Sequence, residues 1–388
     1  MKLAKRVLGI DESVTLQITS KAKKMVKEGI DVISLAAGEP DFDTPTHIKQ
    51  AAIKAIDEGF TKYTPSSAMI ELRHAISRKF MKDNGLDYAP EQIVVSNGAK
   101  HSINNVFQVL CEKGDEVLIP APYWLSYPAM VNMAEAKPVF VPTKKENNFK
   151  LTEKDLELKV TKNTKCLVLN SPSNPTGSVY SREELEVVAK VAVKHKFFVM
   201  SDEIYEKLIY GNTKHVSIAS LGKEINDLTI TVNGVSKSYA MTGWRIGYAA
   251  GPAAVMKAIG NLQSHAASNP ASVSQRATLA ALEESQDCVE KMRVEFAKRR
   301  DIMVAGIESI KNMSCIRPEG AFYLFCDISK LGMSSVEVAN RLLDEAKVAT
   351  IPGEPFGADD FIRLSFATGE EKIKKALGRI KEWVEKNG

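Results

Sequence analysis

The sequence has few cysteines and no long run of apolar residues. Its five cysteines, in a chain of 388 residues, form no CxxC pair, which argues against a disulfide framework and against a zinc site. The first residues carry charge without an uninterrupted apolar core, and no later stretch approaches the length of a membrane span. We therefore expect a protein of the reducing cytoplasm that does not enter a membrane.

Charge of one sign is not in excess either. The 52 basic and 48 acidic residues give a formal net charge of +4, and both signs are scattered along the chain, so nucleic acid is not an expected partner. GxGxxG and GxxxxGK[ST] motifs are absent, and the six histidines lack metal-ligand spacing, so we expect no metal. The segment Gly234-Val235-Ser236-Lys237-Ser238 lacks the closing glycine of a GxSxG elbow, which disfavours a serine hydrolase.

What the sequence does have is a regular alternation, from about residue 90 to 250, of short apolar runs with amphipathic stretches of helical length. Several runs are apolar throughout, as expected for strands buried on both faces of a sheet. The stretch from Glu183 to Lys196 keeps Leu185, Val188 and Ala192 on one helical face. Seven candidate strands occur, at residues 93–95, 117–119, 139–141, 166–169, 197–200, 228–232 and 247–250. The pattern predicts an α/β sandwich with a mainly parallel sheet.

After residue 251 the pattern changes to long helical segments, and from Ser314 a second series of strands and helices begins. A chain of this length also exceeds what one hydrophobic core usually fills. The amphipathic stretch from Thr15 to Glu28 and the segment after it are expected to cross back and join the second part. We therefore expect a large domain of residues 46–285 and a smaller α+β domain of residues 1–45 and 286–388.

Polar residues follow three of the candidate strands, at the sheet edge where ligands of parallel sheets collect. They are Asn174, Asp202 and Lys237, in chain order. An aldehyde cofactor with a phosphate and a pyridine nitrogen needs an amine for its Schiff base, a carboxylate for its pyridinium and a cation for its phosphate. Lys237, Asp202 and Arg245 offer these groups, and desolvation beside Arg245 would push the pKa of Lys237 downward.

Each residue also has an ordinary structural explanation. Taken alone, Lys237 is a surface lysine, Asp202 a helix N-cap, and Asn174-Pro175-Thr176-Gly177 a turn. The segment Ser96-Asn97-Gly98-Ala99-Lys100 precedes an amphipathic helix, so its amides either bind an anion or simply cap that helix. Trp124 either lies on a pyridine ring or packs in the core. The cofactor interpretation is favoured because these residues occur together, in equivalent positions of successive units.

The combination resembles the class I aminotransferases, which have fold type I among pyridoxal-phosphate enzymes, a large domain with a mainly parallel seven-stranded sheet and a smaller domain. The closest likeness is to the branch of bacterial and archaeal aspartate and prephenate aminotransferases. It covers nearly the whole chain and is carried by residues 34–45, 174–177, 236–247, 320–323 and 363–367. The resemblance implies pyridoxal 5'-phosphate as cofactor and amino transfer from L-aspartate to 2-oxoglutarate, giving oxaloacetate and L-glutamate.

The resemblance also implies roles for individual residues at the cofactor. Lys237 would be the Schiff-base lysine and proton carrier, Asp202 would face the pyridine nitrogen, and Tyr205 with Asn174 would face the ring oxygen. Trp124 would stack on the ring. The residues implied at the phosphate are Ser236, Arg245, Gly98, Ala99, Lys100 and, reaching into the neighbouring subunit, Tyr63. An obligate homodimer with shared active sites follows from that use of Tyr63.

For the substrate, the resemblance implies that Arg363 grips the α-carboxylate bidentately, a use that suits a planar guanidinium. Gly38 would contribute a backbone contact, and Trp124 and Asn174 would border the substrate. The distal carboxylate would be bound by Lys100, helped by hydroxyls at Ser13 and Thr15.

Three places depart from the family pattern. Gly234 stands where many relatives have a phosphate-binding serine, so Ser236 must compensate or the contact is absent. Ala68 and Ile70 stand where a glycine and a proline are frequent. The acidic pair Asp11-Glu12 stands where some relatives carry a basic residue for larger dicarboxylates, which favours aspartate over prephenate.

Other functions stay open beside aspartate amino transfer. Within the fold, these are a prephenate, aromatic or neutral amino acid aminotransferase and, after them, a carbon-sulfur lyase. A non-catalytic sensor module of a transcription regulator is a different class. It is disfavoured by the intact set of Lys237, Asp202 and Arg363 and by the lack of a DNA-binding extension before Ser34.

Overall fold

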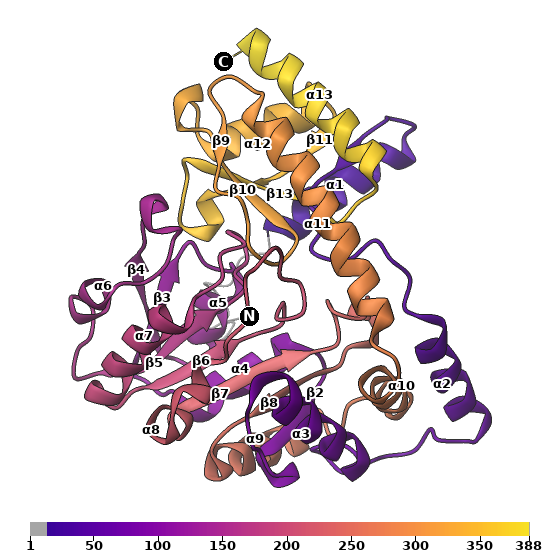
Figure 1. Cartoon of the computed structure of the whole chain (residues 1–388), viewed down its shortest axis with the longest axis vertical. Helices are drawn as coiled ribbons and strands as arrows, with labels where there is room; N and C mark the ends of the chain where they lie inside the picture. The colour runs from indigo at the N-terminus through magenta and orange to yellow at the C-terminus, as the bar shows by residue number, and fades with distance from the viewer. Residues whose placement is uncertain (1–13, 388) are drawn as a thin grey trace, which may run out of the picture.

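The computed structural model of the chain describes residues 14–387, so the predictions for Ser13 and for Asp11-Glu12 lie outside the described residues. Two separate groups of strands and helices are visible, a larger one in the lower part of Figure 1 and a smaller one above it. The helices of eight residues or more are α1 (Val14–Lys27), α2 (Thr46–Asp57), α3 (Ile70–Asn84), α4 (Ala99–Leu110), α5 (Ser126–Met133), α7 (Arg182–His195), α9 (Ala253–Ala266), α10 (Ser272–Glu283), α11 (Asp287–Glu308), α12 (Ser335–Asp344) and α13 (Glu370–Asn387). Two shorter helices are α6 (Glu153–Glu157) and α8 (Lys223–Asn226).

The larger group is built on a seven-stranded sheet of order β2-β8-β7-β6-β5-β3-β4. Its strands are β2 (Ile93–Ser96), β3 (Glu116–Ala121), β4 (Lys137–Pro142), β5 (Thr164–Asn170), β6 (Phe198–Asp202), β7 (Thr229–Gly234) and β8 (Gly247–Ala250). Strand β8 runs antiparallel to both of its neighbours, and the other pairs are parallel. The seven predicted strands and the mainly parallel sheet are therefore confirmed.

Both faces of this sheet are covered, which explains why its strands are apolar throughout. In β5, Cys166 and Val168 pack in one core with residues of α4, α5 and α9, whereas Leu167 and Leu169 pack in another with residues of α7. Helix α7 matches its predicted range closely. It begins after Ser181, whose side chain accepts from the Glu184 N–H in a capping box.

The smaller group holds a four-stranded antiparallel sheet of order β12-β13-β10-β9, with β9 (Ser314–Cys315), β10 (Tyr323–Asp327), β12 (Ile351–Pro352) and β13 (Phe361–Ser365). The N-terminal segment reaches this smaller group, because β1 (Ile33–Ser34) pairs in parallel with β11 (Val348–Ala349) in a separate two-stranded sheet. Its core also takes in residues from the larger group, such as Tyr205 and Leu208. The exact boundaries at residues 46 and 286 therefore stay a prediction.

Between residues 14 and 387, no helix combines the length and apolarity needed to cross a bilayer. All five cysteines are free thiols. The feature that matters for the site is the register of the central strands: Asn170 at the end of β5 lies opposite Asp202 at the end of β6, and Asp202 lies opposite Val232 in β7. The carboxyl ends of three neighbouring strands therefore meet at one place.

Candidate active site

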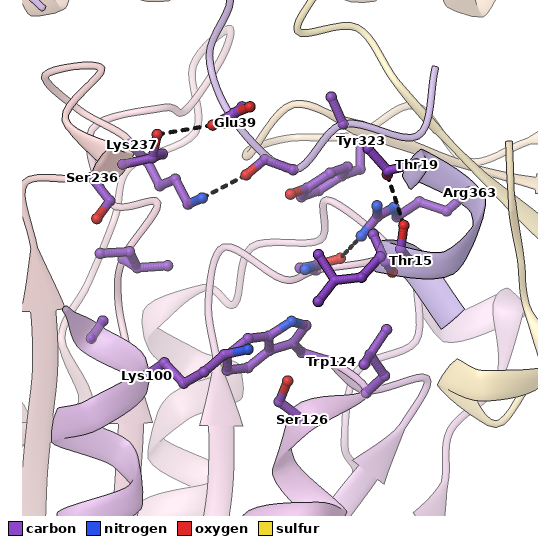
Figure 2. Close-up of a pocket in the computed structure, with 18 of the residues that line it drawn as sticks. Thr15, Thr19, Glu39, Lys100, Trp124, Ser126, Ser236, Lys237, Tyr323 and Arg363 are labelled. Atoms are coloured by element: carbon purple, nitrogen blue, oxygen red, sulfur yellow. Dashed lines mark hydrogen bonds between the residues drawn. The ribbon is translucent and has the colours of Figure 1, made fainter. Parts of the chain in front are cut away.

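A cavity of about 890 Å³ lies at these strand ends, between the large sheet and the smaller group. This volume is in the range of small-molecule sites. In Figure 2, Ser236 and Lys237 lie on one side, Arg363 and Tyr323 on the opposite side, and Lys100 and Trp124 below them. The predicted residues that line the cavity are Thr15, Gly38, Ala99, Lys100, Trp124, Asn174, Asp202, Tyr205, Ser236, Lys237, Arg245 and Arg363.

Lys237 is placed by the loop that follows β7. Its Nζ donates a hydrogen bond to the Gly38 carbonyl at 2.6 Å. Burial lowers the pKa of Lys237 to about 8; the Glu39 carboxylate opposes this lowering, and the positive charges of Arg245 and Arg363 add to it. An amine with this pKa is partly free base near neutral pH, as a nucleophilic lysine requires.

Asp202 ends β6 and is almost fully buried. Burial raises its pKa to about 6, while hydrogen bonds from the Tyr127 hydroxyl at 2.7 Å and from the Ile204 N–H at 3.2 Å oppose the rise. Within residues 14–387 no cationic side chain forms an ion pair with it. A buried carboxylate held only by neutral donors suits a ligand that brings its own N–H cation.

Arg363 lies in β13 and is fully buried. Its Nη1 donates to Asn174 Oδ1 at 2.9 Å and its Nη2 to the Ala36 carbonyl at 3.0 Å, while its buried Nε has no partner among the described residues. The Tyr323 ring centroid lies 4.3 Å from the guanidinium carbon, and the Tyr323 and Tyr205 hydroxyls are 2.9 Å apart. The cation at this end of the cavity is therefore paired only with neutral groups.

At the opposite end of the cavity, two glycines allow the backbone at the start of α4 to lie close to β8 and to Arg245. Gly98 caps α4 with φ +88°, and an added Cβ would collide with the Arg245 guanidinium. Gly247 similarly allows β8 to touch the Ala99 amide. Arg245 donates to the Thr242 and Asn97 carbonyls. The first amides of α4 and this guanidinium lie close together, an arrangement suited to an anion, which favours the binding interpretation of Gly98, Ala99 and Lys100.

Two departures from the family pattern have structural reasons. A Cβ on Gly234 would lie 3.0 Å from both the Gly247 Cα and the Ile246 carbonyl, so a serine there would crowd β8. Ala68 keeps φ +85°, a backbone conformation that glycine adopts without strain. The loop shape expected of a glycine is therefore retained with alanine, at a cost of about 1 kcal/mol.

The remaining predicted residues differ in placement. The Lys100 ammonium lies 5.0 Å from the Trp124 ring centroid, and burial, with Arg245 adding, lowers the pKa of Lys100. Thr15 lines the cavity from α1, and its buried hydroxyl has no partner among the described residues. Tyr63 does not line the cavity, and its side chain is 89% exposed.

Tyr127 and Asn170 are cavity residues that the sequence analysis did not single out. Tyr127 stands one helical turn after Trp124, and the two rings meet edge to face with centroids 5.2 Å apart. That spacing was the available signal. Asn170 ends a predicted strand, but nothing in its sequence context distinguishes it from a turn residue.

Behind Asp202, Glu203, Glu206 and His215 form a buried polar cluster whose oxygen and nitrogen atoms have metal-ligand spacing. His215 Nε2 lies 2.9 Å from Glu203, and Lys79 forms an ion pair with Glu206. The charge of Lys79 holds the pKa of Glu206 at about 2, below its usual range and against the opposing effect of burial. These contacts account for the cluster without an ion, so the expected absence of a metal stays a prediction.

Four of the cations that line the cavity, Lys100, Lys237, Arg245 and Arg363, have no carboxylate partner within ion-pair distance in the part of the chain that the structure describes. A ligand with a phosphate at one end and carboxylates at the other would neutralise them. The residues present thus fit the pyridoxal phosphate that the sequence resemblance implies, with Asp202 available to its ring nitrogen.

Comparison with known proteins agrees with this geometry. Residues 30–380 match the family model of aminotransferases of class I and II. The chain is 50% identical to an aspartate aminotransferase of Geobacillus stearothermophilus over 99% of both chains, and 48% identical to a probable aspartate/prephenate aminotransferase of Aquifex aeolicus over 99% and 98%. The solved structure of aspartate aminotransferase from Thermus thermophilus with maleate superimposes with a TM-score of 0.95 at 43% identity, over 98% and 99% of the chains.

Proposed function

The chain belongs to the aminotransferases of class I and II, and on that premise we propose that it transfers the amino group of L-aspartate to 2-oxoglutarate with pyridoxal 5'-phosphate as cofactor. The observation that carries the proposal is the position of Lys237 in one cavity with Asp202, Arg245 and Arg363. Similarity to aspartate aminotransferases over the whole chain supports the donor.

In this proposal, the cofactor is held by residues from several strand ends. Lys237 would bind its aldehyde carbon, Asp202 its ring nitrogen, and Tyr205 with Asn174 its ring oxygen, while Trp124 packs on the ring. The phosphate would be bound by Ser236, Arg245 and the amides of Gly98, Ala99 and Lys100. When bound, the cofactor supplies an electron sink for the electron pair released at the substrate α-carbon.

The protein's own residues account for the rest of the chemistry. The Lys237 amine, once the substrate amine has displaced it from the aldehyde carbon, would take and return the α-proton, and a pKa of about 8 leaves it partly free base near neutral pH. Arg363 would bind the α-carboxylate and Lys100 the distal carboxylate, and these two contacts would fix which bond of the α-carbon is broken. Tyr127 keeps Asp202 ionised by donating to its carboxylate.

The decisive experiment compares Lys237→Ala with the wild-type protein. Wild-type protein with cofactor, aspartate and 2-oxoglutarate should form oxaloacetate, and borohydride reduction should fix the cofactor to the peptide that contains Lys237. Lys237→Ala should do neither, whereas Lys113→Ala, at an exposed position, should match the wild type. Normal turnover by Lys237→Ala would refute the proposal.

We also propose that the protein works in the cytoplasm as a homodimer whose active sites are shared through Tyr63. The exposed Tyr63 side chain and the exposed Ile53 and Ile56 of α2 support an interface on this side of the molecule.

Prephenate is a second candidate substrate, as the 2-oxo acid that accepts the amino group, since the Aquifex aeolicus relative carries aspartate/prephenate in its name. A panel of half-reactions distinguishes the candidates. Aspartate, a phenylalanine-type donor and the amino acid formed from prephenate are each mixed with loaded protein, and the change in cofactor absorbance gives each rate. Cystathionine, with pyruvate as readout, tests the lyase alternative.

A further inference from the structure

Asn170 is the last residue of β5 and lines the cavity, yet the proposed mechanism gives it no task. Its side-chain amide is used at both ends. Nδ2 donates to the Asp202 backbone carbonyl at 3.0 Å, and Oδ1 accepts from the Asn174 N–H at 2.9 Å. One contact needs a donor and the other an acceptor, so only one orientation of this amide satisfies both.

The two residues that Asn170 joins serve opposite ends of the cavity. The Asp202 carboxylate lies with Tyr127 at the end proposed for the cofactor ring. Asn174 Oδ1 accepts from Arg363 Nη1 at 2.9 Å, at the end proposed for the substrate α-carboxylate. A continuous chain of hydrogen bonds therefore runs from Asp202 through Asn170 and Asn174 to Arg363, and so from the large sheet to the antiparallel sheet.

The segment after Asn170 forms its own turn around Asn174, in which the Ser173 N–H donates to the Ser178 carbonyl and the Gly177 N–H to the Ser173 carbonyl, both at 3.0 Å. It leaves β5 through two prolines, Pro172 and Pro175, neither of which has an N–H to donate. The Ser171 N–H also donates to the Asp202 carbonyl, at 3.2 Å, so the segment is fastened to Asp202 at its start. The Asn170 side chain carries that attachment forward to Asn174.

We propose that Asn170 is a positioning residue that fixes Asn174, and through it Arg363, relative to Asp202. The proposal rests on the function proposed above. It matters there because the substrate α-carbon is oriented by groups at both ends, and such groups must be held within about 0.5 Å of their working positions. Asn170 itself touches no reacting atom.

Two substitutions separate the two hydrogen bonds. Asn170→Ala removes both, so Asn174 and Arg363 should no longer be held in position. The dissociation constant of succinate, a dicarboxylate without an amine, should then rise about tenfold. For aspartate, kcat/KM should fall at least tenfold. Asn170→Asp keeps an acceptor for Asn174 and places a negative charge beside Asp202. Asn170→Asp should bind succinate more tightly than Asn170→Ala does. The pH midpoint, the pH at which the absorbance of the bound cofactor is half-way through its change, should be higher than in the wild type.

Asn226→Asp is the matched control, because Asn226 Nδ2 also donates to a backbone carbonyl, that of Ala219 at 3.2 Å, but away from the cavity. Thermal unfolding of all three variants measures how much stability each substitution removes, separately from its effect on binding. Succinate binding is measured by calorimetry and the pH midpoint by absorbance.

The proposal fails if Asn170→Ala binds succinate like the wild type, or if Asn170→Asp leaves the pH midpoint where Asn226→Asp leaves it. Should Asn170→Ala not fold, the midpoint of Asn170→Asp decides alone. Wild-type protein that takes up no cofactor or forms no oxaloacetate contradicts the proposed function itself, before any variant is compared.

Discussion

At the scale of single residues, burial moves two groups of the cavity toward their neutral forms. It lowers the pKa of Lys237 to about 8 and raises that of Asp202 to about 6. Both shifts have desolvation as their largest cause, since a low-dielectric surrounding disfavours either charge. The same physical effect, desolvation, therefore makes Lys237 easier to deprotonate and makes a cationic partner for Asp202 more favourable.

The lowered pKa of Lys237 predicts how the apo-protein takes up its cofactor with pH. Only the free amine attacks an aldehyde, and the free fraction rises as pH passes through about 8 instead of the usual 10.5. The rate of cofactor uptake, followed by stopped-flow absorbance, should therefore rise with pH and level off by about pH 9. A rate that keeps rising to about pH 11 would contradict the lowered pKa.

Tyr127→Phe tests how Asp202 is kept ionised. The Tyr127 hydroxyl donates to the carboxylate at 2.7 Å, and loss of a hydrogen bond to a charged group should raise the pKa of Asp202 further, by about one unit. Cofactor affinity falls as pH drops through this pKa, so the acidic midpoint of affinity should move to higher pH.

The control is Tyr123→Phe, because the Tyr123 ring stacks on Phe140 and not against Asp202. Equal acidic midpoints for the two variants and the wild type would show that Tyr127 does not support the ionised carboxylate. The measurement is cofactor binding by fluorescence between about pH 5 and 8, a range that spans the raised pKa.

At the scale of elements, the sequence was most informative about strands and the residues at their ends. The central strands are apolar on both faces, so their positions followed from composition, and Asn174, Asp202 and Lys237 were expected together because parallel strands end at one edge. The pairing of β1 with β11 joins Ile33 to Val348, which are far apart in the chain, and no local pattern gives its register.

The same limit applies to the site. Tyr127 and Asn170 act on Asp202 only through contacts between distant segments, with separations of 75 and 32 residues respectively. The spacing from Trp124 can place Tyr127 near the cavity, but no local pattern shows that Tyr127 or Asn170 contacts Asp202. The assignment of Arg363 depended on family resemblance, since a single arginine in an apolar strand otherwise resembles a structural ion-pair residue.

The turn between β2 and α4 is the element whose glycine can be tested directly. Gly98 has φ +88° and ψ 158°, a region almost restricted to glycine, and a Cβ at this position would also displace Arg245. Gly98→Ala should therefore cost about 1–3 kcal/mol of stability and raise the dissociation constant of the cofactor at least tenfold. Thermal unfolding and a cofactor titration measure the two effects.

Gly85→Ala is the matched control for that change. Gly85 also has positive φ, +66°, but an added Cβ there meets nothing within 4 Å. It should lose stability and keep cofactor affinity. If Gly98→Ala behaves in the same way, the turn carries no part of the anion site.

At the scale of the whole molecule, the cavity lies between two groups of elements that one hydrophobic core already joins. Tyr63 is a predicted site residue that does not line this cavity, and it is 89% exposed. A large aromatic side chain left in solvent suits an interface better than a monomer surface.

Mixed dimers test whether Tyr63 serves the cavity of the neighbouring subunit. Tyr63→Ala should weaken cofactor binding and Lys237→Ala should be inactive. In a hybrid of the two chains, the subunit with intact Lys237 receives an intact Tyr63 from its neighbour. Random reassortment should then restore about a quarter of wild-type activity per subunit. Mixing Lys237→Ala with Gly98→Ala should restore none, because both defects act within one chain; equal results for the two mixtures, or a monomer in sedimentation, would exclude shared sites.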